Sequence, residues 1–317
     1  AVEVSDIDLV RETAGHLISG LEGRTRGFVL VQQGCDNSCT FCIIPAARGK
    51  NRATPIQHIT EQVAKLVASG HKEVVLTGVD IAAYGADLGL AADNATGLTR
   101  VIRDVLSAAP RLQRLRLSSL DPARLDEEFF ALLADEPRLM PHLHLSLQAA
   151  EDMVLTRMKR RHRVVDVERL VARARAARTD VVFGADLIAG FPTETDEMFA
   201  TTLGNVRDWD LQYLHVFPYS TRPGTPAARM PQVPGDVVKG RAKQLREVGE
   251  AAHARHLQSL VGTVQTVLTE QSHFGRTESY AAVNIDGPAN ARSIIQVRLN
   301  AAPDGTLTGT PLKEAAE

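Results

Sequence analysis

The three cysteines of this chain all lie in one short segment, with the spacing C-x3-C-x2-C at Cys35, Cys39 and Cys42. Iron–sulfur clusters are held by cysteine thiolates, so three thiolates on one loop match three irons of a 4Fe–4S cube. Because the chain has no fourth cysteine, one iron would be left without a protein ligand. The segment therefore predicts a cluster whose fourth iron is open to a small molecule.

A structural zinc site is the main alternative, and such a site usually has four cysteine or histidine ligands. No histidine lies inside the segment, and the next histidines along the chain, His58 and His71, fall on or beside an expected helix. A disulfide framework does not suit an odd number of cysteines in a chain of 317 residues. The spacing by itself favours the cluster over zinc and leaves both possible.

Composition limits the class of protein. With 317 residues, 44% of them hydrophobic, the chain is long enough for one large domain and one small one. The net charge of −2 gives no overall attraction to nucleic acid or to an anionic membrane, so a polyanionic partner would need a local basic patch. No apolar run reaches membrane-spanning length, and the first residues are too polar for a signal peptide. We therefore expect a cytoplasmic protein without a membrane partner.

Short apolar segments alternate with amphipathic ones over most of the chain. Strands are expected at 28–31, 74–76, 114–118, 143–146, 181–188 and 213–217. Helices are expected between them at 54–70, 98–108, 126–134, 165–178 and 193–206. This alternation indicates parallel βαβ units, and six of them predict an α/β partial barrel whose ligand lies beyond the carboxyl ends of the strands. The cysteine segment follows the first strand at that end.

The last part of the chain has a different pattern. A segment rich in Pro and Gly, 222–234, leads into a long expected helix. Short strands are then expected at 264–268, 280–285, 294–299 and near 307, which predicts a small all-β barrel. We divide the chain into a lead-in at 1–26, a partial barrel at 27–233, a connecting helix at 234–261 and a small β domain at 262–312.

The cysteine spacing after the first strand of a six-unit partial barrel resembles the radical S-adenosylmethionine (SAM) enzymes. Phe41 matches the aromatic residue that this family has before its third cysteine. The resemblance implies a 4Fe–4S cluster on Cys35, Cys39 and Cys42, with SAM bound to the open iron through its amino and carboxylate groups. One electron from the cluster would break the sulfonium bond and give methionine and a 5′-deoxyadenosyl radical.

Further segments resemble the methylthiotransferases, the branch of this family that adds a methylthio group to a carbon. They are HLHLSLQAAEDMVLTRMKR, GADLIAGFPTETDEMF and HVFPYSTRPGTPAARM. TGVDIAAYG at 77–85 resembles the subgroup that acts on threonylcarbamoyladenosine in tRNA, and GRTESYAAVNID at 275–286 resembles the start of a TRAM domain, an RNA-binding barrel. Ala149 and Ala150 depart from the family pattern, in which Ser–Gly is commoner. The resemblance covers roughly residues 24–312.

The resemblance also implies individual site residues. Those expected to contact SAM are Phe41, Thr77, Gly78, Asp80, Ser118, Gln148, Arg160 and Asp186. Those expected to contact tRNA phosphates are Arg157, Lys159, Arg161 and Arg163, beside the barrel mouth, and Arg276 in the small barrel. Each polar residue taken alone also fits a turn, a helix cap or a solvated surface.

The implied activity is methylthiolation of carbon 2 of N6-threonylcarbamoyladenosine beside the tRNA anticodon, with an electron donor such as flavodoxin or ferredoxin. Isopentenyl-adenosine in tRNA and an aspartate of a ribosomal protein are alternative substrates. An RNA-binding module with a structural zinc loop is the alternative from a different class. Methylthiotransferases also have an amino-terminal domain whose three further cysteines hold a second cluster. We do not find it in this sequence, so we expect the chain to be a two-domain piece that does not insert sulfur by itself.

Overall fold

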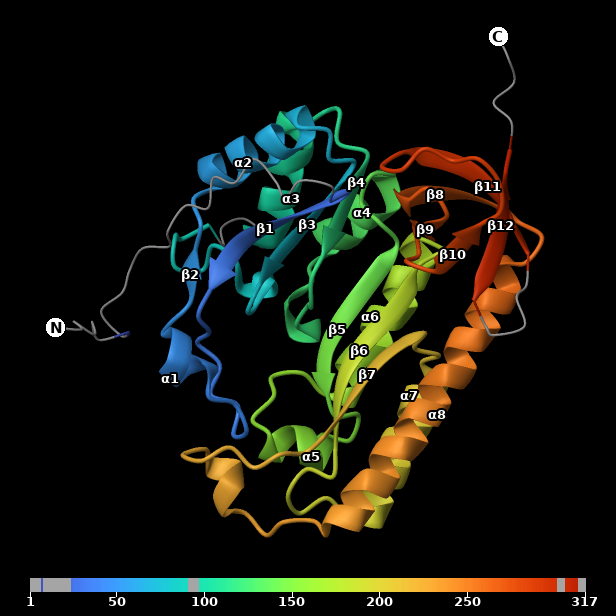
Figure 1. Ribbon diagram of the computed structural model, residues 1–317. Helices are drawn as coiled ribbons and strands as arrows, with labels where there is room; N and C mark the ends of the chain where they lie inside the picture. The colour runs from blue at the N-terminus through green and yellow to red at the C-terminus, as the bar shows by residue number, and fades with distance from the viewer. Residues whose placement is uncertain (1–6, 8–23, 91–96, 301–305, 313–317) are drawn as a thin grey trace, which may run out of the picture.

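The computed structural model of the chain describes residue Ile7 and residues 24–90, 97–300 and 306–312 (Figure 1). The expected lead-in at 1–26 therefore falls almost entirely outside the described residues. None of the described helices is long and apolar enough to cross a membrane.

A curved sheet of parallel strands forms the larger part of the described chain. Its strands are β1 (Arg26–Gln33), β3 (Glu73–Gly78), β4 (Arg114–Leu117), β5 (His142–Gln148), β6 (Val182–Ala189) and β7 (Tyr213–Pro218). The strands pair in the order β1-β3-β4 and β5-β6-β7, and the short antiparallel β2 (Arg52–Ala53) extends the edge at β1. Backbone hydrogen bonds of 2.7 and 2.9 Å, from Leu120 N to His144 O and from Ser146 N to Leu120 O, join the two halves. The expected partial barrel is confirmed.

Helices cover the convex face of this sheet (Figure 1). They are α2 (Ile56–Ala68), α3 (Gly97–Ala108), α4 (Glu127–Asp135), α6 (Val164–Ala177) and α7 (Asp196–Asp208). Strand side chains alternate between faces, and apolar ones such as Val74, Leu115 and Phe183, all fully buried, pack against these helices. The alternate positions carry polar residues to the concave face.

Shorter elements lie at the carboxyl ends of the strands. They are the helices α1 (Ile44–Arg48) and α5 (Asp152–Arg157) and the 3₁₀ turns η2 (Ile81–Ala83), η3 (Pro122–Arg124) and η4 (Pro226–Arg229). The helix start that differs most from the expectation is that of α7, which begins at Asp196 rather than at Thr193. Thr193 has a left-handed φ of 68°, and the hydroxyl of Thr195 instead accepts the cap bond from Met198 N at 3.3 Å.

The last part of the chain is a closed five-stranded barrel, reached through the long helix α8 (Gly235–Leu260). Its strands are β8 (Val264–Gln271), β9 (Phe274–Thr277), β10 (Ala282–Ile285), β11 (Ile294–Asn300) and β12 (Leu307–Pro311). They close in the order β10-β12-β11-β8-β9 around a separate core that includes the fully buried Val267, Val283 and Val297. The small all-β barrel was expected from the sequence, whereas strand β9 was not.

The small barrel packs against the amino-terminal ends of the large sheet's strands, at the top of Figure 1. Arg114 Nη2 donates to Thr266 O at 2.7 Å, and Arg116 Nη2 donates to Thr277 O at 3.0 Å. The Tyr280 ring lies 4.9 Å from the Arg116 guanidinium carbon. This contact closes one end of the half barrel and leaves the carboxyl end open.

The contact is organised around Glu73, whose side chain is completely buried. Its carboxylate lies 2.9 Å from Arg116 Nε and 4.0 Å from Arg114 Nη1, and it also accepts a hydrogen bond from Arg26 Nε. Burial by itself raises the pKa of Glu73, but the charges of these three arginines outweigh burial and hold the pKa below its ordinary value. Glu73 is therefore a buried anion that compensates three cations.

We predict that Glu73→Gln destabilises the chain by about 3–5 kcal/mol, because it leaves buried arginines without their counter-charge. Glu128→Gln, which removes a partly exposed pair with Arg103, serves as the control and should cost less than about 1 kcal/mol. The stabilisation from Glu73 is complete above pH 4.5, the ordinary pKa of a carboxyl group, and is lost as the pH falls below it. Urea denaturation at several pH values measures both effects, and equal losses in the two variants would contradict this assignment.

Candidate functional site

The cysteine loop follows β1 at the open, carboxyl end of the half barrel. Gly34 begins it with φ of 69°, and a Cβ there would lie 1.8 Å from Lys50 O. Cys35 N donates to Gly49 O at 3.1 Å, and Thr40 N donates to Met158 O at 3.1 Å. The loop is therefore fixed by backbone contacts on both sides, and only glycine fits at its first position.

Buried Gln32, the residue two positions before the loop, ties it to the end of β3. Its Nε2 donates to Gly34 O at 2.7 Å and to Asn51 Oδ1 at 2.6 Å, while its Oε1 accepts from Asp80 N at 2.8 Å. Asn37 Nδ2 in turn donates to Asp80 Oδ2 at 3.0 Å. One amide side chain thus positions both the cysteine loop and the Asp80 carboxylate.

A cavity of about 150 Å³ lies between this loop and the ends of the neighbouring strands. It brings together seven residues that the sequence predicted, namely Cys35, Cys39, Cys42, Phe41, Asp80, Gln148 and Arg160. The strand-end residues Ser119 and Ser146 also line it, as do two polar residues that the sequence analysis missed, Asn37 and Asp121. Asn and Asp are common in turns, so the sequence held no signal that would single these two out.

Four of the residues predicted for SAM lie outside the lining of this cavity. Thr77 and Gly78 end β3, and a Cβ at Gly78 would lie 2.7 Å from Gln32 O. The Ser118 hydroxyl is buried just after β4 and has no hydrogen-bond partner among the described residues. Asp186 lies within β6 and accepts hydrogen bonds from His144 and His215. The predicted roles of these four residues stay predictions.

The sulfur atoms lie next to hydrogen-bond donors. Asn37 N donates to Cys35 Sγ and Ile44 N to Cys42 Sγ, both at 3.4 Å, and Arg160 Nη1 lies 3.6 Å from Cys39 Sγ. Burial raises the pKa of Cys35 to about 11 and also raises the pKa of Cys42, against the effect of these donors. A metal centre that binds here must therefore displace thiol protons, and the nearby donors then stabilise the thiolates.

The thiols suit a cluster better than a single ion. A tetrahedral zinc ion, with Zn–S bonds of about 2.3 Å, needs its sulfur ligands about 3.8 Å apart. In the described part of the chain, at least two of the three cysteine Sγ atoms lie more than 4.8 Å apart. A cluster binds each thiolate to a different iron and so holds the sulfurs further apart. The spacing of the sulfurs therefore argues against a zinc ion held by the three thiolates.

The rest of the cavity offers charges of both signs. Arg160, whose side chain is 8% exposed, donates to Ser146 O at 2.6 Å and lies 3.4 Å from Asp121 Oδ2. Burial and the neighbouring Asp121 raise the pKa of Asp80, while nearby arginines oppose this shift. A guanidinium group and two carboxyl groups around one space suit a zwitterionic ligand with an amino group and a carboxylate.

The basic residues predicted for RNA differ in what they contact. Lys159 and Arg161 are exposed. Arg157 Nη1 donates to Thr193 O at 2.9 Å, and Arg163 Nη1 donates to Asp152 O at 3.1 Å. Arg276 Nε lies 3.3 Å from Glu270 Oε1. Lys159 and Arg161 are therefore the better placed for phosphate contacts.

We predict that Gly34→Ala lowers iron loading at least severalfold, because a Cβ would force the loop away from Lys50 O. Gly89→Ala is the matched control, since Gly89 has a similar φ of 66° but no atom within 4 Å of an added Cβ. Iron and sulfide per chain after anaerobic reconstitution give the result, and circular dichroism checks the fold. Full iron loading in Gly34→Ala would show that the backbone turn does not position the cysteines.

The model of the Radical SAM superfamily matches residues 29–205. Threonylcarbamoyladenosine tRNA methylthiotransferase MtaB from Rickettsia prowazekii is 49% identical over 285 residues, which are 90% of this chain and 67% of that protein. MtaB from Thermotoga maritima is 38% identical, over 78% of this chain and 56% of that protein. The tRNA-2-methylthio-N(6)-dimethylallyladenosine synthase from Maricaulis maris is 37% identical, over 89% and 64%. The chain thus spans between 56% and 67% of the length of these relatives.

Solved structures show the same fold at lower identity. The radical SAM methyltransferase TsrM from Kitasatospora setae, with cobalamin and a [4Fe-4S] cluster bound, has a TM-score of 0.56 at 18% identity, over 73% of this chain and 54% of that chain. Coproporphyrinogen III oxidase HemN from Escherichia coli has a TM-score of 0.50 at 18% identity, over 87% and 67%. The match to the superfamily model and the 49% identity to a methylthiotransferase show that the chain belongs to the radical SAM superfamily, in the branch of the methylthiotransferases.

Proposed function

We propose that this chain provides the SAM-cleaving and RNA-binding parts of an enzyme that adds a methylthio group to carbon 2 of N6-threonylcarbamoyladenosine in tRNA. The observation that carries the proposal is the loop of three cysteines beside a cavity of mixed charge. This chain is 49% identical to a protein named for that activity and 37% identical to a protein named for the dimethylallyl substrate. The difference in identity favours the threonylcarbamoyl substrate.

Within this proposal, Cys35, Cys39 and Cys42 hold three irons of a 4Fe–4S cluster. When bound, the cluster supplies the electron that cleaves the sulfonium bond of SAM. In this proposal Arg160 pairs with the SAM carboxylate, and Asp80 accepts a hydrogen bond from the SAM amino group. Thr77, Gly78, Ser118, Gln148 and Asp186 remain candidates for the rest of the cofactor.

The small barrel, β8 to β12, is in this proposal a TRAM domain that contacts tRNA, together with Lys159 and Arg161 at the open end. The electron donor is a small redox protein of the flavodoxin or ferredoxin type, and the enzyme works in the cytoplasm, where tRNA is modified. Support comes from the closed five-stranded topology and from the basic residues exposed beside the cavity.

The activity is tested in two steps. Anaerobically reconstituted chain should form 5′-deoxyadenosine from SAM with dithionite, and Cys39→Ala should abolish it, because one iron loses its ligand. Cells in which the natural gene is deleted should lack the 2-methylthio group on threonylcarbamoyladenosine, measured by mass spectrometry of digested tRNA. If 5′-deoxyadenosine forms but the tRNA is unchanged, the chain is a radical SAM enzyme with another substrate. If no 5′-deoxyadenosine forms and the 2-methylthio group stays on the tRNA, the proposal fails.

We predict that the double variant Lys159→Ala, Arg161→Ala binds tRNA more weakly than the parent chain. The magnitude of the slope of log affinity against log salt should fall by about 1–2, because each substitution removes one phosphate contact. The control is Arg100→Ala, Arg103→Ala on the convex helix α3, where both side chains are half exposed. Fluorescence anisotropy between low and moderate salt measures the slopes. Equal slopes in the two double variants would place the RNA elsewhere.

A further inference from the structure

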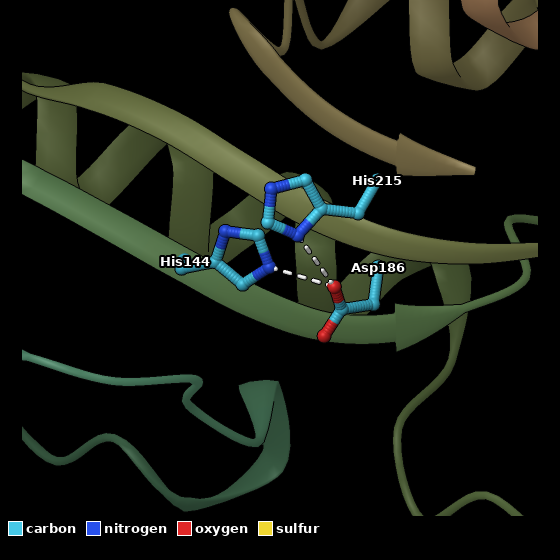
Figure 2. A group of neighbouring side chains, drawn as sticks. All are labelled: His144, Asp186 and His215. Carbon is cyan, nitrogen blue, oxygen red and sulfur yellow. Dashed lines mark hydrogen bonds and ion pairs between the residues drawn. The ribbon is translucent and has the colours of Figure 1, made fainter. Parts of the chain in front are cut away.

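Three side chains converge on the concave face of the half barrel, outside the lining of the cysteine cavity (Figure 2). They are His144 of β5, Asp186 of β6 and His215 of β7. His144 Nε2 lies 3.0 Å and His215 Nδ1 lies 3.1 Å from the same oxygen, Asp186 Oδ1. Among the described residues, they are the group of histidine, cysteine and carboxylate ligands whose atoms all lie within 4.8 Å of one another.

The register of the sheet produces this convergence. Asp186 stands directly opposite His215 across β6 and β7, and His144 stands opposite Gly184 across β5 and β6. A Cβ at Gly184 would lie 2.3 Å from His144 Nδ1, so only glycine lets the imidazole lean over β6 toward the carboxylate. The position of His144 thus depends on a missing side chain in the neighbouring strand.

We propose that His144, Asp186 and His215 bind a divalent transition-metal ion, with zinc and ferrous iron as the fitting chemistry for two imidazoles and one carboxylate. Bonds of about 2.0–2.2 Å at tetrahedral or octahedral angles place neighbouring ligand atoms about 2.9–3.4 Å apart. The observed distances of 3.0 and 3.1 Å already lie in this range. As a metal ligand, each imidazole binds through the nitrogen that faces Asp186 and carries its single proton on the other ring nitrogen. The proton that the ring donates to Asp186 in the empty site therefore moves to that other nitrogen when the ion binds.

The charge and exposure of the group agree with this assignment. Burial raises the pKa of Asp186, but hydrogen bonds and charge from the two histidines outweigh burial and lower it, so the carboxylate is anionic. The side chain of His144 is 9% exposed and that of His215 is 62% exposed. An ion therefore has an entry path on the His215 side, and three protein ligands leave coordination positions open to a molecule on the concave face.

The proposed ion site is separate from the cysteine loop but close to it. Ser146, which lines the cysteine cavity, follows His144 two residues along β5. At about 3.3 Å per residue, His144 lies about 7 Å along the strand from that cavity's edge. The half barrel would then carry two metal centres on one face, one on cysteines and one on histidines and a carboxylate.

The test uses the whole chain with its three cysteines replaced by serine, so that thiolates cannot bind the added metal. Zn²⁺ in equilibrium dialysis and Co²⁺ followed by its visible absorbance are the probes. We expect one ion per chain and a melting temperature that rises with metal concentration. His144→Ala and Asp186→Asn should each weaken binding at least tenfold, while the exposed His58→Ala on α2 should not. Gly184→Ala should also weaken binding although it removes no ligand, because it displaces the His144 ring.

The proposal is overturned if the serine variant binds neither ion, or if His144→Ala, Asp186→Asn and Gly184→Ala bind as tightly as their parent, which would mean adventitious binding only. Should circular dichroism show that a buried variant does not fold, the exposed His215→Ala decides: a loss of at least tenfold supports the site and unchanged affinity rejects it. The test is independent of methylthio transfer, because the variant has no cysteines to hold a cluster.

Discussion

A fully buried carboxylate, that of Glu73, joins the two parts of this protein. It lies among Arg26, Arg114 and Arg116 on the first three parallel strands. Two of these arginines also donate to backbone carbonyls of the small barrel. Buried charges are stable only when counter-charges and hydrogen bonds replace the lost water. Glu73 supplies the counter-charge for the arginines, and the carbonyls of the small barrel supply hydrogen-bond acceptors, so both parts are needed. The amino-terminal end of the half barrel is therefore closed by polar groups, and chemistry is left to the opposite end.

That opposite end is built from the loops after the strands. Gln32 connects the cysteine loop to Asp80 after β3, and Arg160 connects it to Ser146 on β5. Four loops separated in sequence thus hold one cavity, and each is anchored to a rigid strand. The concave face between the two ends carries polar side chains such as Arg116, His144 and Asp186, because apolar alternate positions of the strands already pack against the convex helices.

Periodic segments were predicted well and short ones poorly. The strand expected at 181–188 is β6, and the helix expected at 165–178 is α6, because long apolar or helically periodic runs leave little choice. Strand β9 and helix α5 were missed, since β9 contains Gly275 and Arg276 between few apolar residues and α5 has only six residues. β9 is a strand because β8 and β10 pair with it on both sides. In the site, Asn37 and Asp121 gave no signal that distinguished them from turn residues.

The sequence alone determined the cysteine loop, because C-x3-C-x2-C places three thiols on one short stretch of backbone wherever the rest of the chain goes. The order of strands and helices was likewise readable, since hydrophobic periodicity is a local property. Only the tertiary structure determined which side chains contact one another. His144, Asp186 and His215 come from three strands and converge through sheet register and the space left by Gly184, and Glu73 is enclosed only once the small barrel has docked. Contacts of this kind depend on the packing of distant segments, which no local pattern specifies.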